Sequence, residues 1–111
     1  MRTANRRSVR RCALVASVQV TEPLSGAVLS ARISELAIGG CYVDALNPFP
    51  EGTPVTVRIV RDQGAFETKA KVAYCDSSSG MGLAFTEMAP EQRSLLETWI
   101  ADIVGQLRPV S

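Results

Sequence analysis

The chain has 111 residues, of which 46% are hydrophobic and 21% charged, a size and composition typical of one small folded domain and unlike a disordered segment. It contains no histidine, which excludes Ser-His and Cys-His nucleophile pairs and every zinc site that needs imidazole. The net charge is +1, and three scattered cysteines suit neither a thiolate metal cluster nor a complete disulfide framework, so buried thiols in a reducing compartment are expected.

The first eleven residues form a basic arm. Five of the twelve lysine and arginine residues lie in it: Arg2, Arg6, Arg7, Arg10 and Arg11. All eleven acidic residues lie at Glu22 or beyond, so the rest of the chain is net acidic. This asymmetry predicts an anionic partner for the arm, whether nucleic acid, nucleotide or membrane surface.

The apolar run from Cys12 to Val20 resembles the hydrophobic part of a secretory signal peptide. Ser17 and Gln19 interrupt it, however, and no small-x-small cleavage site closes it. Its side chains alternate with period two from Ala13 onward, which predicts the first strand. Because no apolar stretch approaches the ~20 residues that span a bilayer, we expect a soluble, cytoplasmic protein without membrane insertion.

Two further strands and a tight corner are predicted next. A turn over residues 21–26, with a proline and a glycine, precedes a second strand from Ala27 to Leu36. Gly39 and Gly40 interrupt the extended pattern, and Cys41 to Val43 resumes it. The segment therefore predicts a hairpin corner at the two glycines.

The clearest hairpin joins residues 55–60 to residues 66–74, with a turn at residues 62–64. Its predicted inward row on the second strand is Phe66, Thr68, Ala70, Val72 and Tyr74. A loop rich in proline and glycine at residues 47–52 precedes it, and a last strand follows at residues 81–85.

A closing helix is predicted at about residues 90–107. Pro90 occupies the first-turn position that proline favours, and Glu91 complements the helix dipole. Apolar residues then recur at spacings of three and four: Leu95, Leu96, Trp99, Ile100, Ile103 and Leu107. The expected organisation is a basic arm at 1–11, a domain at 12–108 and a short tail at 109–111. The fold class is all-β with one C-terminal helix, a small six-stranded antiparallel barrel of Greek-key or meander topology.

Two arginine pairs in the arm have four-residue spacing, Arg6 with Arg10 and Arg7 with Arg11. A guanidinium donates five hydrogen bonds in a planar fork and binds a phosphate or a guanine edge in a bidentate way. Two forks on an arm could clamp a guanine nucleotide. An arginine run alone is weak evidence for such a clamp, because it is more often a solvated or nonspecific basic arm.

A second motif lies at the hairpin corner, where Glu35 is followed by Ala37 two residues later and by Gly40 five residues later. Together with an upstream Arg-x-x-x-Arg, this resembles the two-part signature of PilZ domains, the bacterial receptors for cyclic di-GMP. That family has Asp or Asn, any residue, Ser, two further residues and Gly. The resemblance extends over nearly the whole chain and includes the Gly-Met-Gly-Leu-Ala-Phe segment at residues 80–85.

The resemblance implies a six-stranded PilZ-like barrel in which the basic arm folds over a ligand on the barrel surface. Arg7 and Arg11 match the arginine pair of the family, and Arg6 matches a further arginine that commonly precedes it. Glu35, Ala37 and Gly40 match the second motif. The implied ligand-binding residues are Arg6, Arg7, Arg10, Arg11, Glu35, Ala37 and Gly40, with no catalytic residue, metal or cofactor.

Two departures from the family pattern affect this site. Glu35 keeps a carboxylate that accepts from the guanine N1 and N2 donors, but on a longer side chain, and Ala37 has no hydroxyl. One lost hydrogen bond costs about 0.5 to 1.5 kcal/mol, or about threefold to tenfold in affinity.

The predicted function is a non-enzymatic receptor that binds cyclic di-GMP and signals to an effector protein by reordering the arm. The alternative is a degenerate PilZ-like interaction module that does not bind the dinucleotide. A nucleic-acid binder is disfavoured because the strands are expected to lack exposed aromatic residues. Whether the protein forms a homodimer, and which effector it contacts, stays open.

Overall fold

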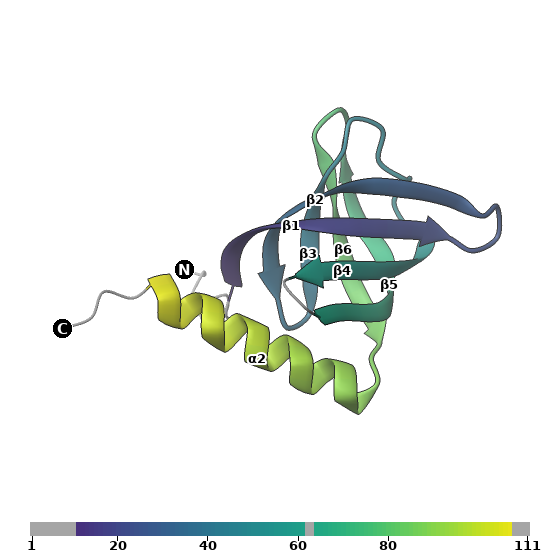
Figure 1. The fold of residues 1–111 in the computed structure, drawn as a ribbon. Coiled ribbons are helices and arrows are strands. Elements are labelled where there is room, and N and C mark those ends of the chain that lie inside the picture. Colours follow the sequence, from purple (N-terminus) through teal and green to yellow (C-terminus); the bar gives the residue numbers. More distant parts are fainter. Residues whose placement is uncertain (1–10, 62–63, 108–111) are drawn as a thin grey trace, which may run out of the picture.

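The structure is a computed structural model that describes residues 11–61 and 64–107, with the backbone alone for residues 11–15 and 104–107. In this part of the chain, strands β1 to β6 are followed by helix α2 (Figure 1). Their bounds are β1 (Arg11–Glu22), β2 (Ala27–Ala37), β3 (Gly40–Asp44), β4 (Pro54–Arg61), β5 (Gly64–Asp76), β6 (Gly80–Glu87) and α2 (Pro90–Leu107). The predicted tail at 109–111 and most of the arm lie outside the described residues.

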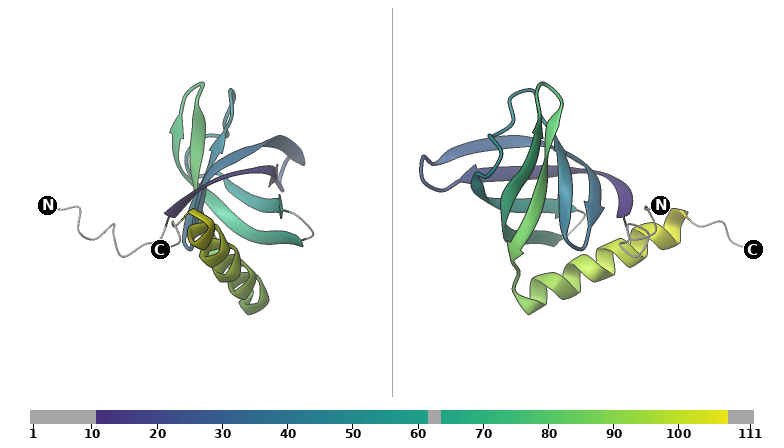
Figure 2. Two further views of the ribbon diagram at one scale, coloured as in Figure 1. Left: turned by 60° about the vertical axis from the view of Figure 1, so that its left-hand side comes forward. Right: turned by 180° about the vertical axis from the view of Figure 1, so that it is seen from behind.

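The six strands form a closed antiparallel barrel in the order β1-β2-β3-β6-β5-β4. Strands β1, β2 and β3 follow one another as neighbours, and the longer connection after β3 returns β4 to the side of β1. This 4-1-2-3 arrangement is a Greek key rather than a simple meander. Two further views show the strands curving around one interior (Figure 2). The predicted six-stranded antiparallel barrel with a C-terminal helix is therefore confirmed.

The barrel interior is filled by apolar side chains that alternate along the strands, as the period-two patterns predicted. On β4 and β5, for example, Val57, Ile59, Phe66 and Val72 are fully buried. The polar faces of the same strands lie outside, because successive side chains of a strand point to opposite faces. The alternation thus determines which residues are available on the outer surface for a ligand.

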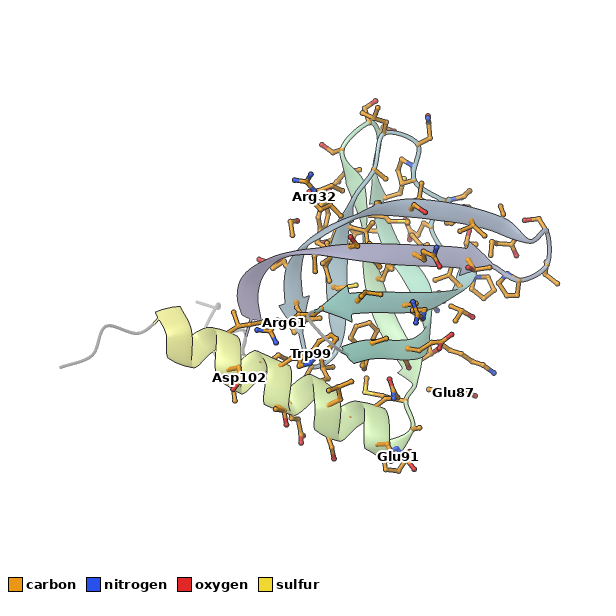
Figure 3. All side chains as sticks on the ribbon, viewed as in Figure 1. Arg32, Arg61, Glu87, Glu91, Trp99 and Asp102 are labelled. Carbon is orange, nitrogen blue, oxygen red and sulfur yellow. The ribbon has the colours of Figure 1, made fainter. Side chains whose placement is uncertain are left out.

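Helix α2 lies across the barrel and adds its apolar face to the barrel core (Figure 1). Four helix residues are buried there: Leu96, Trp99, Ile100 and Ile103. The Trp99 ring lies 6.4 Å from the Phe66 ring of β5, and the Arg61 guanidinium lies 5.8 Å from the Trp99 ring (Figure 3). On the outer face, Arg93 and Glu97 form an ion pair of 3.4 Å. The predicted amphipathic helix is confirmed, and Trp99 is a core residue.

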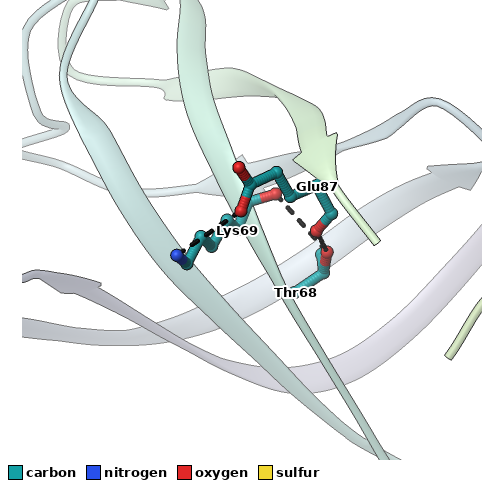
Figure 4. A network of polar contacts seen from close by, with 3 residues as sticks. All are labelled: Thr68, Lys69 and Glu87. Atoms are coloured by element: carbon teal, nitrogen blue, oxygen red, sulfur yellow. Dashed lines mark hydrogen bonds and ion pairs between the residues drawn. The ribbon is translucent and has the colours of Figure 1, made fainter. Parts of the chain in front are cut away.

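Polar contacts link the end of β6 to β5 just before the helix begins (Figure 4). The hydroxyl of the buried Thr68 donates a 2.5 Å hydrogen bond to the carbonyl oxygen of Glu87. The carboxylate of Glu87 also lies 3.4 Å from the Lys69 ammonium, with both side chains exposed. Because Thr68 is buried, its hydroxyl needs a partner, and this hydrogen bond provides one.

Two expectations about β5 were wrong. Tyr74 was placed in the inward row, but its side chain is 49% exposed, and Cys75, expected to be a buried thiol, is exposed. The pairing of β5 with β6 is irregular between Val72 and Tyr74. One extra residue there breaks the alternation of faces, so Tyr74 no longer follows the inward row.

We expect the two described cysteines to differ sharply toward thiol reagents. Cys41 is buried, and burial raises the pKa of its thiol to about 12, whereas Cys75 is exposed. Since the thiolate is the reactive form, Cys75 should be alkylated by iodoacetamide in the native protein while Cys41 is protected. Peptide mapping by mass spectrometry before and after unfolding measures this for each site. Rapid native labelling of Cys41 would contradict the described packing of β3.

Candidate functional site

A row of residues on neighbouring strands crosses the outer face of the barrel near the β2–β3 corner. Backbone pairing aligns Ala13 of β1 with Glu35 of β2, and Glu35 with Tyr42 of β3. Tyr42 in turn pairs with Gly82 of β6, which pairs with Tyr74 of β5. Neighbouring strands lie about 4.8 Å apart, so this row brings a carboxylate and two phenol rings within reach of one small ligand.

A second row runs beside the first. It joins Arg11 of β1 to Ala37 of β2, Gly40 of β3, Ala84 of β6 and Lys71 of β5. Its three central positions carry a methyl group or no side chain at all. The row therefore forms a low floor with a basic residue at each of its two ends.

A pocket of about 140 Å³ lies over the two rows. It is lined by Glu35, Leu36, Ala37, Gly40, Cys41, Tyr42, Ala73, Tyr74, Gly82 and Leu83. Glu35 is the single carboxylate among these lining residues. Pockets that hold a whole drug-sized ligand have volumes of about 300 to 1,000 Å³, so this one has room for only part of a dinucleotide.

An irregular pairing between Ile33 and Glu35 places the Glu35 carboxylate beside this pocket. Ile33 and Leu36 are both fully buried, although a regular strand would place residues three apart on opposite faces. The extra residue between them leaves Glu35 half-buried. Glu35 and Ala37 flank the buried Leu36 and share one face, as their spacing predicted.

Gly40 allows the close approach of β3 to β6. A Cβ atom at this position would press against the carbonyl oxygen of Leu83, a backbone atom that cannot move aside cheaply. The backbone at Gly40 does not adopt a positive φ, so the glycine is needed for the approach of two strands rather than for a left-handed turn. The expectation that Gly40 permits the corner thus acquires a specific steric reason.

Two glycines of β6 are covered by the rings of the two tyrosines. A Cβ atom at Gly82 would overlap the Tyr74 ring, and one at Gly80 would lie 2.8 Å from the Tyr42 ring. The ring centroids of Tyr42 and Tyr74 are 6.2 Å apart, with an angle of 32° between the ring planes. We call this pair, together with the two glycines beneath it, the tyrosine shelf.

The Tyr42 hydroxyl donates a 3.0 Å hydrogen bond to the Asp76 carboxylate. Desolvation, followed by this hydrogen bond and the nearby negative charges, raises the pKa of Tyr42 to about 12. The phenol therefore stays protonated at neutral pH and continues to donate to Asp76. This contact fixes one ring of the shelf.

Of the seven predicted ligand-binding residues, the structure brings Glu35, Ala37 and Gly40 together at one pocket. Arg6, Arg7 and Arg10 lie outside the described residues. Arg11 is described by its backbone, which opens β1 and pairs with Ala37, so the last residue of the predicted arm already belongs to the barrel.

The sequence-based prediction missed Tyr42 and Tyr74. A possible signal was the Gly-x-Gly spacing at Gly80 and Gly82, because glycine at alternate positions of a strand leaves one face free for side chains of the neighbouring strands. The exposed Tyr74 also contradicts the expectation that the strands lack exposed aromatic residues.

Within residues 11–61 and 64–107, no group of three or more cysteine, aspartate or glutamate side chains is arranged to hold a metal ion. Helix α2, the one helix of this described part, is not long and apolar enough to cross a membrane.

Comparison with known proteins gives consistent results. The family model described as PilZ domain matches residues 4–102. The solved PilZ domain of YcgR from Escherichia coli with c-di-GMP is 18% identical, with a TM-score of 0.74, and the match covers 93% of this chain and 95% of that one. The PilZ domain of CeSA from a cellulose-synthesizing bacterium is 20% identical, with a TM-score of 0.64 and coverage of 88% and 98%.

A longer protein also matches. The Bacillus subtilis inhibitor of motility, MotI/DgrA, is 21% identical with a TM-score of 0.76, and the match covers 93% of this chain but 53% of that one. The chain thus spans about half the length of this relative. A comparison with curated proteins finds no match.

The solved structures are too distant in sequence to show more than the fold, and that fold is the barrel with a C-terminal helix described above. The family model adds sequence information over residues 4–102, which include both parts of the resemblance found in the sequence. On this basis the chain belongs to the PilZ domain family.

Proposed function

We propose that the protein is a receptor for cyclic di-GMP that binds the dinucleotide over the β2–β3 corner and does not transform it. The observation that carries the proposal is that Glu35, Ala37 and Gly40, the three residues of the second motif, line one pocket together. The cyclic di-GMP named for the solved YcgR PilZ domain supports the choice of ligand.

The arrangement of the barrel favours a site shared with the basic arm. Arg11 pairs with Ala37 at the corner, so the first described residue of the chain lies next to the pocket. Arginine forks from the arm can bind phosphates and guanine faces, while Glu35 accepts from the guanine N1 and N2 donors. Contacts with the ligand would order the arm as it closes. The closed arm would then present a changed surface to a cytoplasmic effector.

A purely binding role fits the chemistry of the lining. Its one carboxylate has no histidine beside it in a chain that contains none, and the Cys41 thiol is buried with its pKa raised to about 12. Neither group is arranged as an activated nucleophile with a base. The proposed receptor therefore needs no catalytic residue and no cofactor.

The second candidate is an interaction module that keeps the fold without the dinucleotide. The residues at positions 35 and 37 favour it, because Glu35 is longer than the Asp or Asn of the family pattern and Ala37 lacks a hydroxyl. Such a module would bind a partner protein and show no affinity for cyclic di-GMP.

Isothermal titration calorimetry of the purified protein tests the receptor. We expect binding of cyclic di-GMP in preference to cyclic di-AMP and GTP. Guanine offers arginine two acceptors, O6 and N7, and offers the Glu35 carboxylate the N1 and N2 donors, whereas adenine carries a donor in place of O6. Equal affinity for both cyclic dinucleotides, or no heat with either, would count against the receptor and favour the interaction module.

A further inference from the structure

The tyrosine shelf lies on the outer surface of the barrel and is not part of the barrel core. Its rings lie on the outer face of β3, β5 and β6, and Tyr74 remains 49% exposed although most apolar side chains of these strands are buried. Gly80 and Gly82 make room for the rings, since a Cβ atom at either position would collide with them. The local structure thus holds a flat aromatic surface open to solvent.

The shelf and the Glu35 carboxylate belong to the same pocket. Glu35, Tyr42, Gly82 and Tyr74 occupy consecutive strands of one row, and all four line the pocket of about 140 Å³. A carboxylate beside an aromatic face supplies the two contacts that a guanine base needs, namely an acceptor for its N1 and N2 donors and a surface for its ring.

We propose that one guanine base of the dinucleotide stacks on the tyrosine shelf, chiefly on Tyr74, while Glu35 binds the edge of the same base. This inference rests on the proposed function and extends it to residues outside both parts of the family signature. Tyr42 acts as a positioning residue, because its hydrogen bond to Asp76 holds the ring beside which Tyr74 lies.

The two contacts make separable contributions to recognition. Stacking on an aromatic ring tolerates any base, because every base has a π face, so Tyr74 contributes affinity. The carboxylate distinguishes guanine from adenine through the pattern of donors, so Glu35 contributes selectivity. Loss of the Tyr74 ring should therefore weaken the binding of both cyclic di-GMP and cyclic di-AMP. Loss of the Glu35 charge should instead reduce the difference in affinity between these two ligands.

Calorimetric titration of Tyr74→Ala with cyclic di-GMP tests the stacking. We expect affinity to fall about tenfold, because stacking on an aromatic side chain contributes on the order of 1 kcal/mol or more per base. Tyr74→Phe, which keeps the ring, should bind like the parent. Val28→Ala removes an exposed apolar side chain that does not line the pocket, and it should leave affinity unchanged.

Tyr74 also covers Gly82, so its removal could loosen the barrel. Tyr74→Leu keeps an apolar cover without a flat ring, and it should retain the parent melting temperature while losing the same affinity as Tyr74→Ala. A readout specific to stacking is the NMR signal of the Tyr74 ring protons, which should shift upfield when the ligand binds to the parent.

The outcomes separate the shelf from the receptor. Absence of binding by the parent protein overturns the proposed function and the shelf with it. If the parent binds the dinucleotide and Tyr74→Leu binds it with the same affinity, the shelf alone is overturned. The same holds if the parent binds without a shift of the Tyr74 ring protons. Reduced affinity in Tyr74→Leu at an unchanged melting temperature, together with parent-like affinity in Tyr74→Phe, supports it.

Discussion

Arg7→Ala and Arg11→Ala should each weaken the binding of cyclic di-GMP by about 1.5 to 3 kcal/mol, or roughly 10- to 150-fold, the contribution of hydrogen bonds to a charged group. Each substitution removes a guanidinium fork that the proposed site uses for phosphate or guanine contacts. Calorimetric titration of each variant beside the parent measures the loss, and thermal unfolding measures any effect on the fold.

The melting temperatures should stay close to that of the parent. Arg11 joins β1 to Ala37 through its backbone, and a change of side chain leaves that pairing in place. Arg32→Ala is the matched control, because Arg32 is an exposed arginine on β2 that does not line the pocket. Early melting of Arg7→Ala or Arg11→Ala would show that the arginine is structural, and reduced affinity in Arg32→Ala would show a general charge effect.

Most of the strands could be predicted because alternation carries information about both the element and its face. The row of Val55, Val57 and Ile59 and its partner row from Phe66 to Val72 lie inside the barrel as expected. The helix could be predicted equally well, because Pro90 marks its start and the spacing of Leu96, Trp99 and Ile103 defines one face.

The misplacement of Tyr74 follows from an irregularity that alternation does not reveal. Between Val72 and Tyr74 the pairing of β5 with β6 shifts by one residue, which turns Tyr74 outward. Such a bulge depends on the strand that lies opposite. No local pattern in residues 66–76 distinguishes it from a regular strand.

The residues of the candidate site also divide into those that the sequence could identify and those that it could not. Glu35, Ala37 and Gly40 could be identified from their spacing, because they belong to one short segment. Tyr42 and Tyr74 reach the pocket only through the pairing of β3 and β5 with Gly82 on β6. Their contribution depends on strand order around the barrel, which brings together segments far apart in the chain.

The double variant Glu35→Asp with Ala37→Ser should bind cyclic di-GMP about tenfold more tightly than the parent, a gain near 1.4 kcal/mol. Serine restores a hydroxyl, and aspartate shortens the carboxylate to the length that the family pattern uses. Glu35 and Ala37 face the same pocket across the buried Leu36, so both changes can act on one base. Both positions are half-buried and each change is small, so the melting temperature should change little.

Titration of the parent and the double variant side by side separates the two candidate functions. Binding by the parent that tightens in the variant supports a receptor with two weakened contacts at the β2–β3 corner. Binding by the variant alone indicates an interaction module that has lost its ligand while keeping the fold. Equal affinity in both proteins would place the dinucleotide elsewhere on the barrel, because a hydroxyl and a shorter carboxylate at the pocket cannot both be neutral if the guanine edge lies against them.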